Sequence, residues 1–105
     1  MKRDNVLSII GIASKAGKAA GGEYQTEHAV KSHKAALVIL AEDASENTKK
    51  KFQSMCDFYR TELIFYGNRE SLGHCTGKGF RASVAITDKG LAQSVRKKLA
   101  QTTTE

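Results

Sequence analysis

Six consecutive apolar residues, Ala36-Leu37-Val38-Ile39-Leu40-Ala41, form the stretch that decides the fold of this 105-residue chain. Their number fits a strand, and the absence of alternating polar residues predicts a strand buried on both faces. A sheet that is covered on both faces needs a layer of helices on each side. We therefore expect a three-layer α/β/α sandwich.

Outward from this strand, segments with helical periodicity alternate with short apolar runs. Gly17 is expected to end the first helix, and Ser45 and Asn68 are expected N-caps. Helices are expected at about residues 5–15, 22–32, 45–59, 68–74 and 89–100, and further strands at 18–21, 63–66 and 83–87. The fold class is thus α/β, with a small mixed sheet of about four strands. The length predicts a single domain at 1–100, followed by a flexible tail at 101–105.

The composition favours a polyanionic partner. Lys and Arg number 17 against 11 Asp and Glu, which gives a formal net charge of +6. Such an excess on a small domain favours nucleic acid through counterion release, although many small basic proteins are simply soluble. No apolar run approaches the length that spans a bilayer, and the residues after Met1 lack the apolar core of a signal peptide. We expect a cytoplasmic monomer without membrane contact.

The residue types that carry catalysis or bind metals are not arranged for either task. Cys56 and Cys75 lack C-x-x-C spacing and are expected to be small buried thiols. His28 and His33 diverge around a helix, and His74 points away from its neighbour, so no metal ligands converge. No nucleophile is paired with a base. We expect no enzymatic activity, no cofactor and no metal.

Two glycine patterns resemble nucleotide-binding motifs only in their letters. Gly11 and Gly17 are separated by five residues instead of the four of a phosphate-binding loop, and Ala19 replaces the hydroxyl residue that holds magnesium. Residues 77–82 match a dinucleotide fingerprint, but they precede an expected strand instead of following one. Both nucleotide-binding hypotheses are therefore rejected.

A first candidate RNA-binding segment opens the second helix. It comprises Gly21, Gly22, Glu23, Tyr24, Gln25, Thr26 and His28, and continues to Lys31. The glycines let another backbone approach a helix start, whose free amides attract phosphate or base oxygens. Gln25 can donate and accept on a base edge, and Thr26 adds a hydroxyl. Tyr24, His28 and Lys31 share one helix face, which suits RNA and equally suits an ordinary solvated surface.

A second candidate segment precedes the last expected strand. It contains Lys78, Gly79, Phe80, Arg81 and Ala82. Lys78 and Arg81 can clamp a phosphate on a flexible glycine backbone. Phe80 can stack on an extruded base, a contact worth about 1–3 kcal/mol. The alternative is that Phe80 packs inward and the charges only solvate the loop.

At these two segments the chain resembles the kink-turn-binding family of ribosomal proteins typified by archaeal L7Ae and eukaryotic L30e. The order of elements matches over roughly residues 5–100. The matching residues are Gly22, Gln25-Thr26, Ala29-Val30, Lys31, the stretch 37–44, Leu72-Gly73, Gly77 and the stretch 82–86. The short bacterial version, with Glu42-Asp43-Ala44-Ser45 and Leu72-Gly73-His74, is especially similar.

This resemblance implies a sandwich that grips a sharply bent RNA. In the family, the start of the second helix contacts sheared G·A pairs, and the loop before the last strand holds a flipped-out base. The residues implied for the paired part are Gly22, Gln25, Thr26 and His28. Those implied for the extruded nucleotide are Gly79, Phe80, Arg81 and Ala82. Lys18 and Lys31 would neutralise nearby phosphate.

Two positions depart from the pattern of the bacterial members. Tyr24 and His28 stand where a lysine is usual, so phosphate contact should be weaker. We predict a non-catalytic, ribosomal-protein-like protein that recognises a bent or kink-turn-like RNA. The alternative is a protein-interaction or scaffold module associated with the ribosome.

Overall fold

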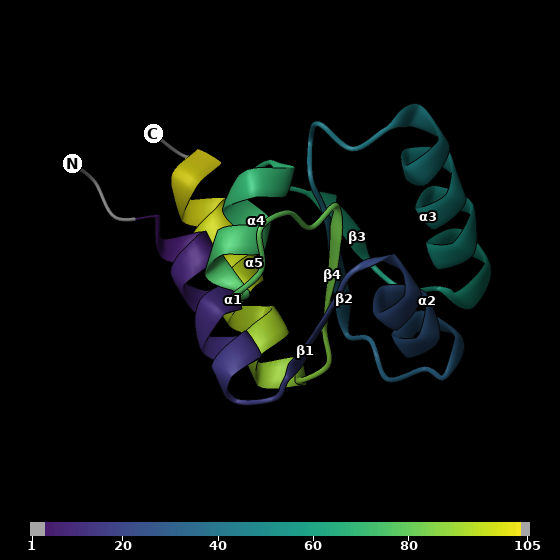
Figure 1. Ribbon diagram of the computed structural model, residues 1–105. Coiled ribbons are helices and arrows are strands. Elements are labelled where there is room, and N and C mark those ends of the chain that lie inside the picture. The colour runs from purple at the N-terminus through teal and green to yellow at the C-terminus, as the bar shows by residue number, and fades with distance from the viewer. Residues whose placement is uncertain (1–3, 104–105) are drawn as a thin grey trace.

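The computed structural model describes residues 4–103, which form three layers (Figure 1). The elements, in chain order, are α1 (Asn5–Lys15), β1 (Ala19–Gly21), α2 (Glu23–Lys31), β2 (Leu37–Leu40), α3 (Glu46–Tyr59), β3 (Leu63–Phe65), α4 (Arg69–Cys75), β4 (Ser83–Ile86) and α5 (Lys89–Thr103). Helices α1, α4 and α5 cover one face of the sheet, and α2 and α3 cover the other (Figure 1). The predicted α/β/α sandwich is confirmed.

The four strands form one mixed sheet in the order β1-β4-β2-β3. Strand β4 runs antiparallel to both β1 and β2, whereas β2 and β3 are parallel. In this register Gly21 lies opposite Val84. The end of β1 is therefore beside the beginning of β4, and the start of α2 lies next to the loop that enters β4.

The central strand is buried on both faces, as its unbroken apolar run predicts. Leu37 and Ile39 pack into the core under α1, α4 and α5, whereas Val38 and Leu40 pack against α2 and α3. Each fully buried aliphatic side chain contributes about 1.5–3 kcal/mol, so both layers are anchored by this strand. No helix among residues 4–103 combines the length and the apolar composition that crossing a bilayer requires.

The helix boundaries follow the expected capping residues. The Ser45 side chain accepts a hydrogen bond from the Thr48 amide at 3.1 Å, and Asn68 forms a reciprocal capping box with Ser71. Gly17 adopts a φ of 72° just after α1. The expected end of the last helix is wrong, because α5 continues to Thr103 with no glycine or proline to stop it. Only 104–105 of the expected tail lies outside the described residues.

Candidate nucleic-acid interface

The two candidate segments meet where the Arg81 side chain crosses the backbone of Gly21 and Gly22. A Cβ added to Gly21 would lie 3.0 Å from the guanidinium carbon of Arg81, and one added to Gly22 would overlap its Nη1 atom. Gly22 also has φ 94° and ψ 160°, a conformation that is essentially restricted to glycine. Gly22 is thus required by its backbone conformation, whereas a Cβ at Gly21 would oblige the Arg81 side chain to shift by a few tenths of an ångström. We call residues 21–28 together with 76–82 the joint surface.

Thr26 holds the joint surface together from inside. Its side chain is fully buried, donates a hydrogen bond to the Ala20 carbonyl at 3.3 Å and accepts one from the Ser83 hydroxyl at 3.1 Å. These bonds connect α2 with β1 and β4. The hydroxyl is therefore not displayed on the surface. Thr26 holds α2 against β1 and β4, whereas the sequence predicted that it would contact RNA bases. Its burial is signalled by its helical spacing with Ala29 and Val30, which are also buried.

The exposed part of α2 carries the polar and aromatic groups of the first segment. Tyr24 is 74% exposed, and its ring stacks on that of His28 with centroids 6.4 Å apart. Gln25 is exposed beside it. Tyr24, His28 and Lys31 line one shallow hollow together with Glu27. The shared helix face predicted for these residues is confirmed, and it offers rings and an amide to a ligand.

The cations near this face are largely engaged by α2's own carboxylates. Lys31 lies 2.7 Å from Glu27, and Lys51 of α3 lies 2.8 Å from Glu23 and 2.9 Å from Glu27. The hydrogen bonds from Lys31 and Lys51 lower the pKa of Glu27, and the bond to Glu27 raises the pKa of Lys31. Lys18 is exposed. Lys51 comes from a distant helix, so its two pairs cannot be read from the sequence, whereas the pair of Glu27 and Lys31 has the i, i+4 spacing of neighbours on a helix.

The loop at 76–82 is fixed against α4 by a close backbone approach. A Cβ added to Gly73 would lie 2.6 Å from the backbone of Gly79. The Lys78 amide donates to the Gly73 carbonyl at 2.8 Å, and the Arg81 amide donates to the Arg69 carbonyl at 2.9 Å. These contacts hold the loop in one position against α4.

The side chains of this loop differ in what they display. Phe80 is 73% exposed, so the alternative that it packs inward is wrong. Lys78 and Gly79 are exposed, and Ala82 is half-buried, its carbonyl accepting a hydrogen bond from the Ala41 amide at 2.9 Å. The loop thus exposes the ring of Phe80 and the ammonium group of Lys78 next to the close contact of Gly73 with Gly79.

Arg81 sits half-buried between the two segments. Its Nε atom is buried without a hydrogen-bond partner in residues 4–103, and its side chain forms no ion pair within that range. An unsatisfied buried donor costs about 1–3 kcal/mol. The guanidinium charge is consequently held over the two glycines, and no carboxylate of the described part of the chain pairs with it.

Comparison with known proteins identifies the family of this chain. A model of the ribosomal protein L7Ae/L30e/S12e/Gadd45 family matches residues 4–96. The chain belongs to this family.

Among its L7Ae-family relatives, RNA-binding protein YlxQ of Bacillus subtilis is 37% identical over 87 residues, which cover 83% of this chain and 87% of that protein. RNA-binding protein YlxQ of Enterococcus faecium is 33% identical, with 90% of each chain covered. Large ribosomal subunit protein eL30 of Spodoptera frugiperda is 33% identical, with 83% of this chain and 79% of that one covered.

Two solved structures have the L7Ae-family fold in common with this chain. A protein of unknown function from Bacillus halodurans C superposes with a TM-score of 0.87 at 33% identity, covering 93% of this chain and 99% of that one. A 15.5kD RNA binding protein of Giardia lamblia superposes with a TM-score of 0.76 at 19% identity, covering 92% and 83%. The second likeness supports the fold alone.

The cysteines of this L7Ae-family protein sit in surroundings that disfavour the reactive thiolate. Cys56 is 2% exposed, and burial raises its pKa to about 11. Burial also raises the pKa of the half-buried Cys75. The expectation of a buried thiol is confirmed for Cys56 and only partly met by Cys75. Residues 4–103 contain no cluster of three potential metal ligands.

Proposed function

We propose that this protein binds structured RNA through the joint surface, without catalysing a reaction. The observation that carries the proposal is the contact of Arg81 with Gly21 and Gly22, which makes one continuous surface of the two segments. Membership of a ribosomal-protein family supports it, as do two relatives named as RNA-binding proteins. We further propose that the protein acts as a cytoplasmic monomer.

The exposed groups of the joint surface favour a bent RNA with unstacked bases. Tyr24 and Phe80 present rings on which such bases stack. Gln25 pairs with a base edge, as an amide can both donate and accept. Lys78 and Arg81 meet phosphate. A kink-turn-like RNA supplies a sharp bend and an extruded base in one molecule, so it is the target that we propose.

The variant Gln25→Ala tests the proposal that Gln25 recognises a base of the structured RNA. We expect the variant to lose about 1–3 kcal/mol of affinity for a kink-turn RNA, and much less for a random single strand of equal length, because the amide contacts a base held in fixed geometry. Fluorescence anisotropy with both labelled RNAs measures the two losses. Gln53→Ala on α3 is the matched control, since that glutamine is also exposed on a helix.

Equal losses on the two RNAs would contradict specific reading by Gln25. If the wild-type protein retains no RNA at low salt in a gel shift with total RNA, the whole proposal fails. That result would favour the alternative of a ribosome-associated scaffold.

A further inference from the structure

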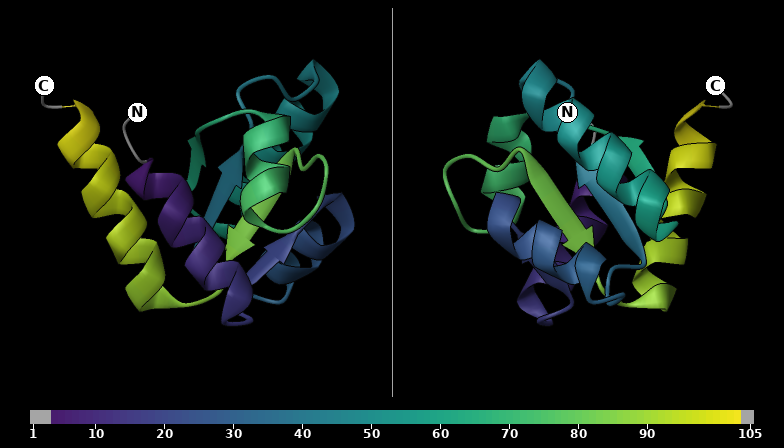
Figure 2. Two further views of the ribbon diagram at one scale, coloured as in Figure 1. Left: turned by 60° about the vertical axis from the view of Figure 1, so that its left-hand side comes forward. Right: turned by 90° about the vertical axis from the view of Figure 1, so that its right-hand side faces the viewer.

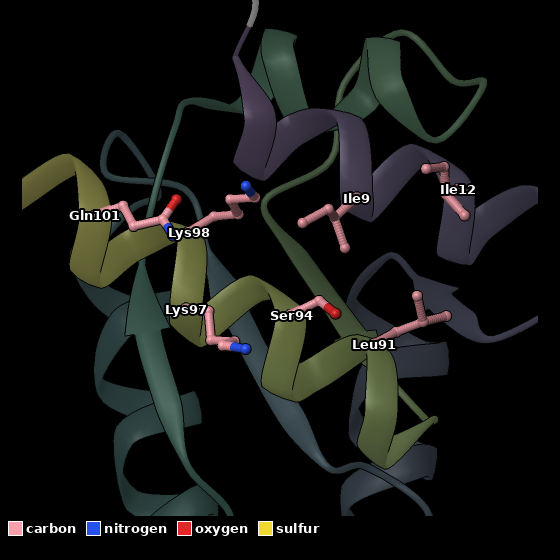
Figure 3. Close-up of a pocket in the computed structure, with 7 residues that line it drawn as sticks. All are labelled: Ile9, Ile12, Leu91, Ser94, Lys97, Lys98 and Gln101. Atoms are coloured by element: carbon pink, nitrogen blue, oxygen red, sulfur yellow. The ribbon is translucent and has the colours of Figure 1, made fainter.

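Helices α1 and α5 lie side by side on the face of the sheet that is turned away from α2 and α3 (Figure 2). A groove runs between these two helices. Its volume is about 380 Å³. The residues that line it are Ile9, Ile12, Leu91, Ser94, Lys97, Lys98 and Gln101 (Figure 3). The joint surface uses none of them, so the groove has no part in the proposed RNA contact.

The groove has an apolar end and a basic end. Ile9, Ile12 and Leu91 lie together at one end, and Lys97 and Lys98 lie further along α5 (Figure 3). Ile12 is 57% exposed, although it is a large aliphatic residue in a regular helix. A single exposed aliphatic residue is ordinary, but here it borders a groove with further apolar walls. The occupant must therefore be apolar at one end and polar at the other.

The charge of the two helices restricts the occupant further. Neither α1 nor α5 contains an aspartate or a glutamate. Their basic residues are Lys15, Lys89, Arg96, Lys97 and Lys98. Arg96 is paired with Glu62, whereas Lys97 and Lys98 form no ion pair with any residue of the described stretch 4–103. Among the described residues, no carboxylate thus pairs with the lysines at the basic end of the groove.

We propose that this groove docks an acidic amphipathic segment of a partner protein. Its apolar side chains would pack on Ile9, Ile12 and Leu91, and its carboxylates would meet Lys97 and Lys98. Helices with apolar anchors commonly bind grooves of this kind. RNA fits less well, because the apolar end offers no hydrogen bonds to a base edge. A second copy also fits less well, because the two basic ends would repel each other.

The probe for this proposal is a synthetic helical peptide with leucines on one face and glutamates on the other. Its matched control carries lysines in place of the glutamates. Amide chemical-shift mapping on the intact protein is expected to show the acidic peptide perturbing the residues that line the groove. The lysine peptide is expected to leave them unchanged.

Variants of the groove test its apolar end and its basic end in turn. Ile12→Asp should weaken binding of the acidic peptide by about tenfold or more, since it replaces an exposed aliphatic side chain that the peptide would cover with a carboxylate that repels the glutamates. Lys97→Glu combined with Lys98→Glu should lose the acidic peptide and gain the lysine peptide. Lys50→Glu on α3 is the control and should change neither. All of these positions have exposed or partly exposed side chains, so the fold should be retained, which circular dichroism checks.

Equal binding of the two peptides, or shifts outside the groove, would overturn the proposal. So would a kink-turn RNA that perturbs the groove, or self-association that Ile12→Asp abolishes. Any change of RNA affinity in the Lys97 and Lys98 variant should be no larger per charge than in Lys50→Glu, because it would reflect the net charge alone. The failure of this proposal is therefore distinguishable from a failure of RNA binding at the joint surface.

Discussion

Two separate features of the joint surface require a glycine at position 22. Its φ of 94° is accessible to glycine, and the space above its Cα atom is filled by the Arg81 guanidinium. The sequence indicated only that a glycine at a helix start permits close approach. It did not indicate Arg81 as the neighbour, because the two residues are far apart in the chain.

Replacing Gly22 with alanine should therefore destabilise the protein. We expect a loss of about 1–3 kcal/mol in the free energy of unfolding, from backbone strain and from displacement of Arg81. Urea denaturation measures it. In the double variant with Arg81→Ala, the overlap disappears and only the strain should remain. Gly79→Ala is the control, because an added Cβ there meets nothing within 4 Å. Equal stability of Gly22→Ala and the wild type would contradict the account.

The two exposed rings of the joint surface should contribute to RNA affinity but not to stability. Tyr24→Ala and Phe80→Ala are each expected to weaken binding of a kink-turn RNA by about 1–3 kcal/mol, through loss of base stacking. Phe58 is a matched control, since its ring is 78% exposed on α3, outside the joint surface. Anisotropy titrations of the three variants compare them directly. A loss for Phe58→Ala as large as for the other two would contradict the proposed location.

At the scale of elements, the sequence located every helix and strand to within a few residues. Periodicity and caps are local properties, so they can be read from the chain. The neighbours of each strand cannot be read in this way. Strand β1 pairs with β4 at the opposite end of the chain, and this pairing creates the joint surface. The role of Thr26 differs from the prediction for the same reason, since its hydroxyl bonds to β1 and β4. Lys31 is engaged by Glu27 one turn away in α2, and only the further pair of Glu27 with Lys51 of α3 is non-local.

Thr26→Val tests whether this residue positions elements or contacts RNA. Valine has a similar shape but lacks the hydroxyl that accepts from Ser83 and donates to Ala20. We expect a loss of about 1–3 kcal/mol of stability from the unpaired buried groups, measured by denaturation. Unchanged stability together with weaker RNA binding would instead favour direct contact. Adding Ser83→Ala should recover part of the loss.

At the scale of the whole molecule, the positive charge is not concentrated on the joint surface. Residues 21–28 carry Glu23 and Glu27, and residues 76–82 carry Lys78 and Arg81, so these charges balance formally. Helices α1 and α5 carry five basic residues and no acidic ones on the other side of the sheet. The net charge of +6 therefore favours polyanions without locating them. In the proposed binding mode, base contacts supply more of the affinity at the joint surface than neutralisation of phosphates.

The central claim is that RNA binds at the joint surface and not at the basic face of α1 and α5. Amide chemical-shift mapping with a kink-turn RNA tests it most directly. We predict that residues 21–28 and 76–82 shift together at one affinity, while α1 and α5 stay unchanged. Shifts confined to α1 and α5, or shifts in only one of the two segments, would contradict the claim.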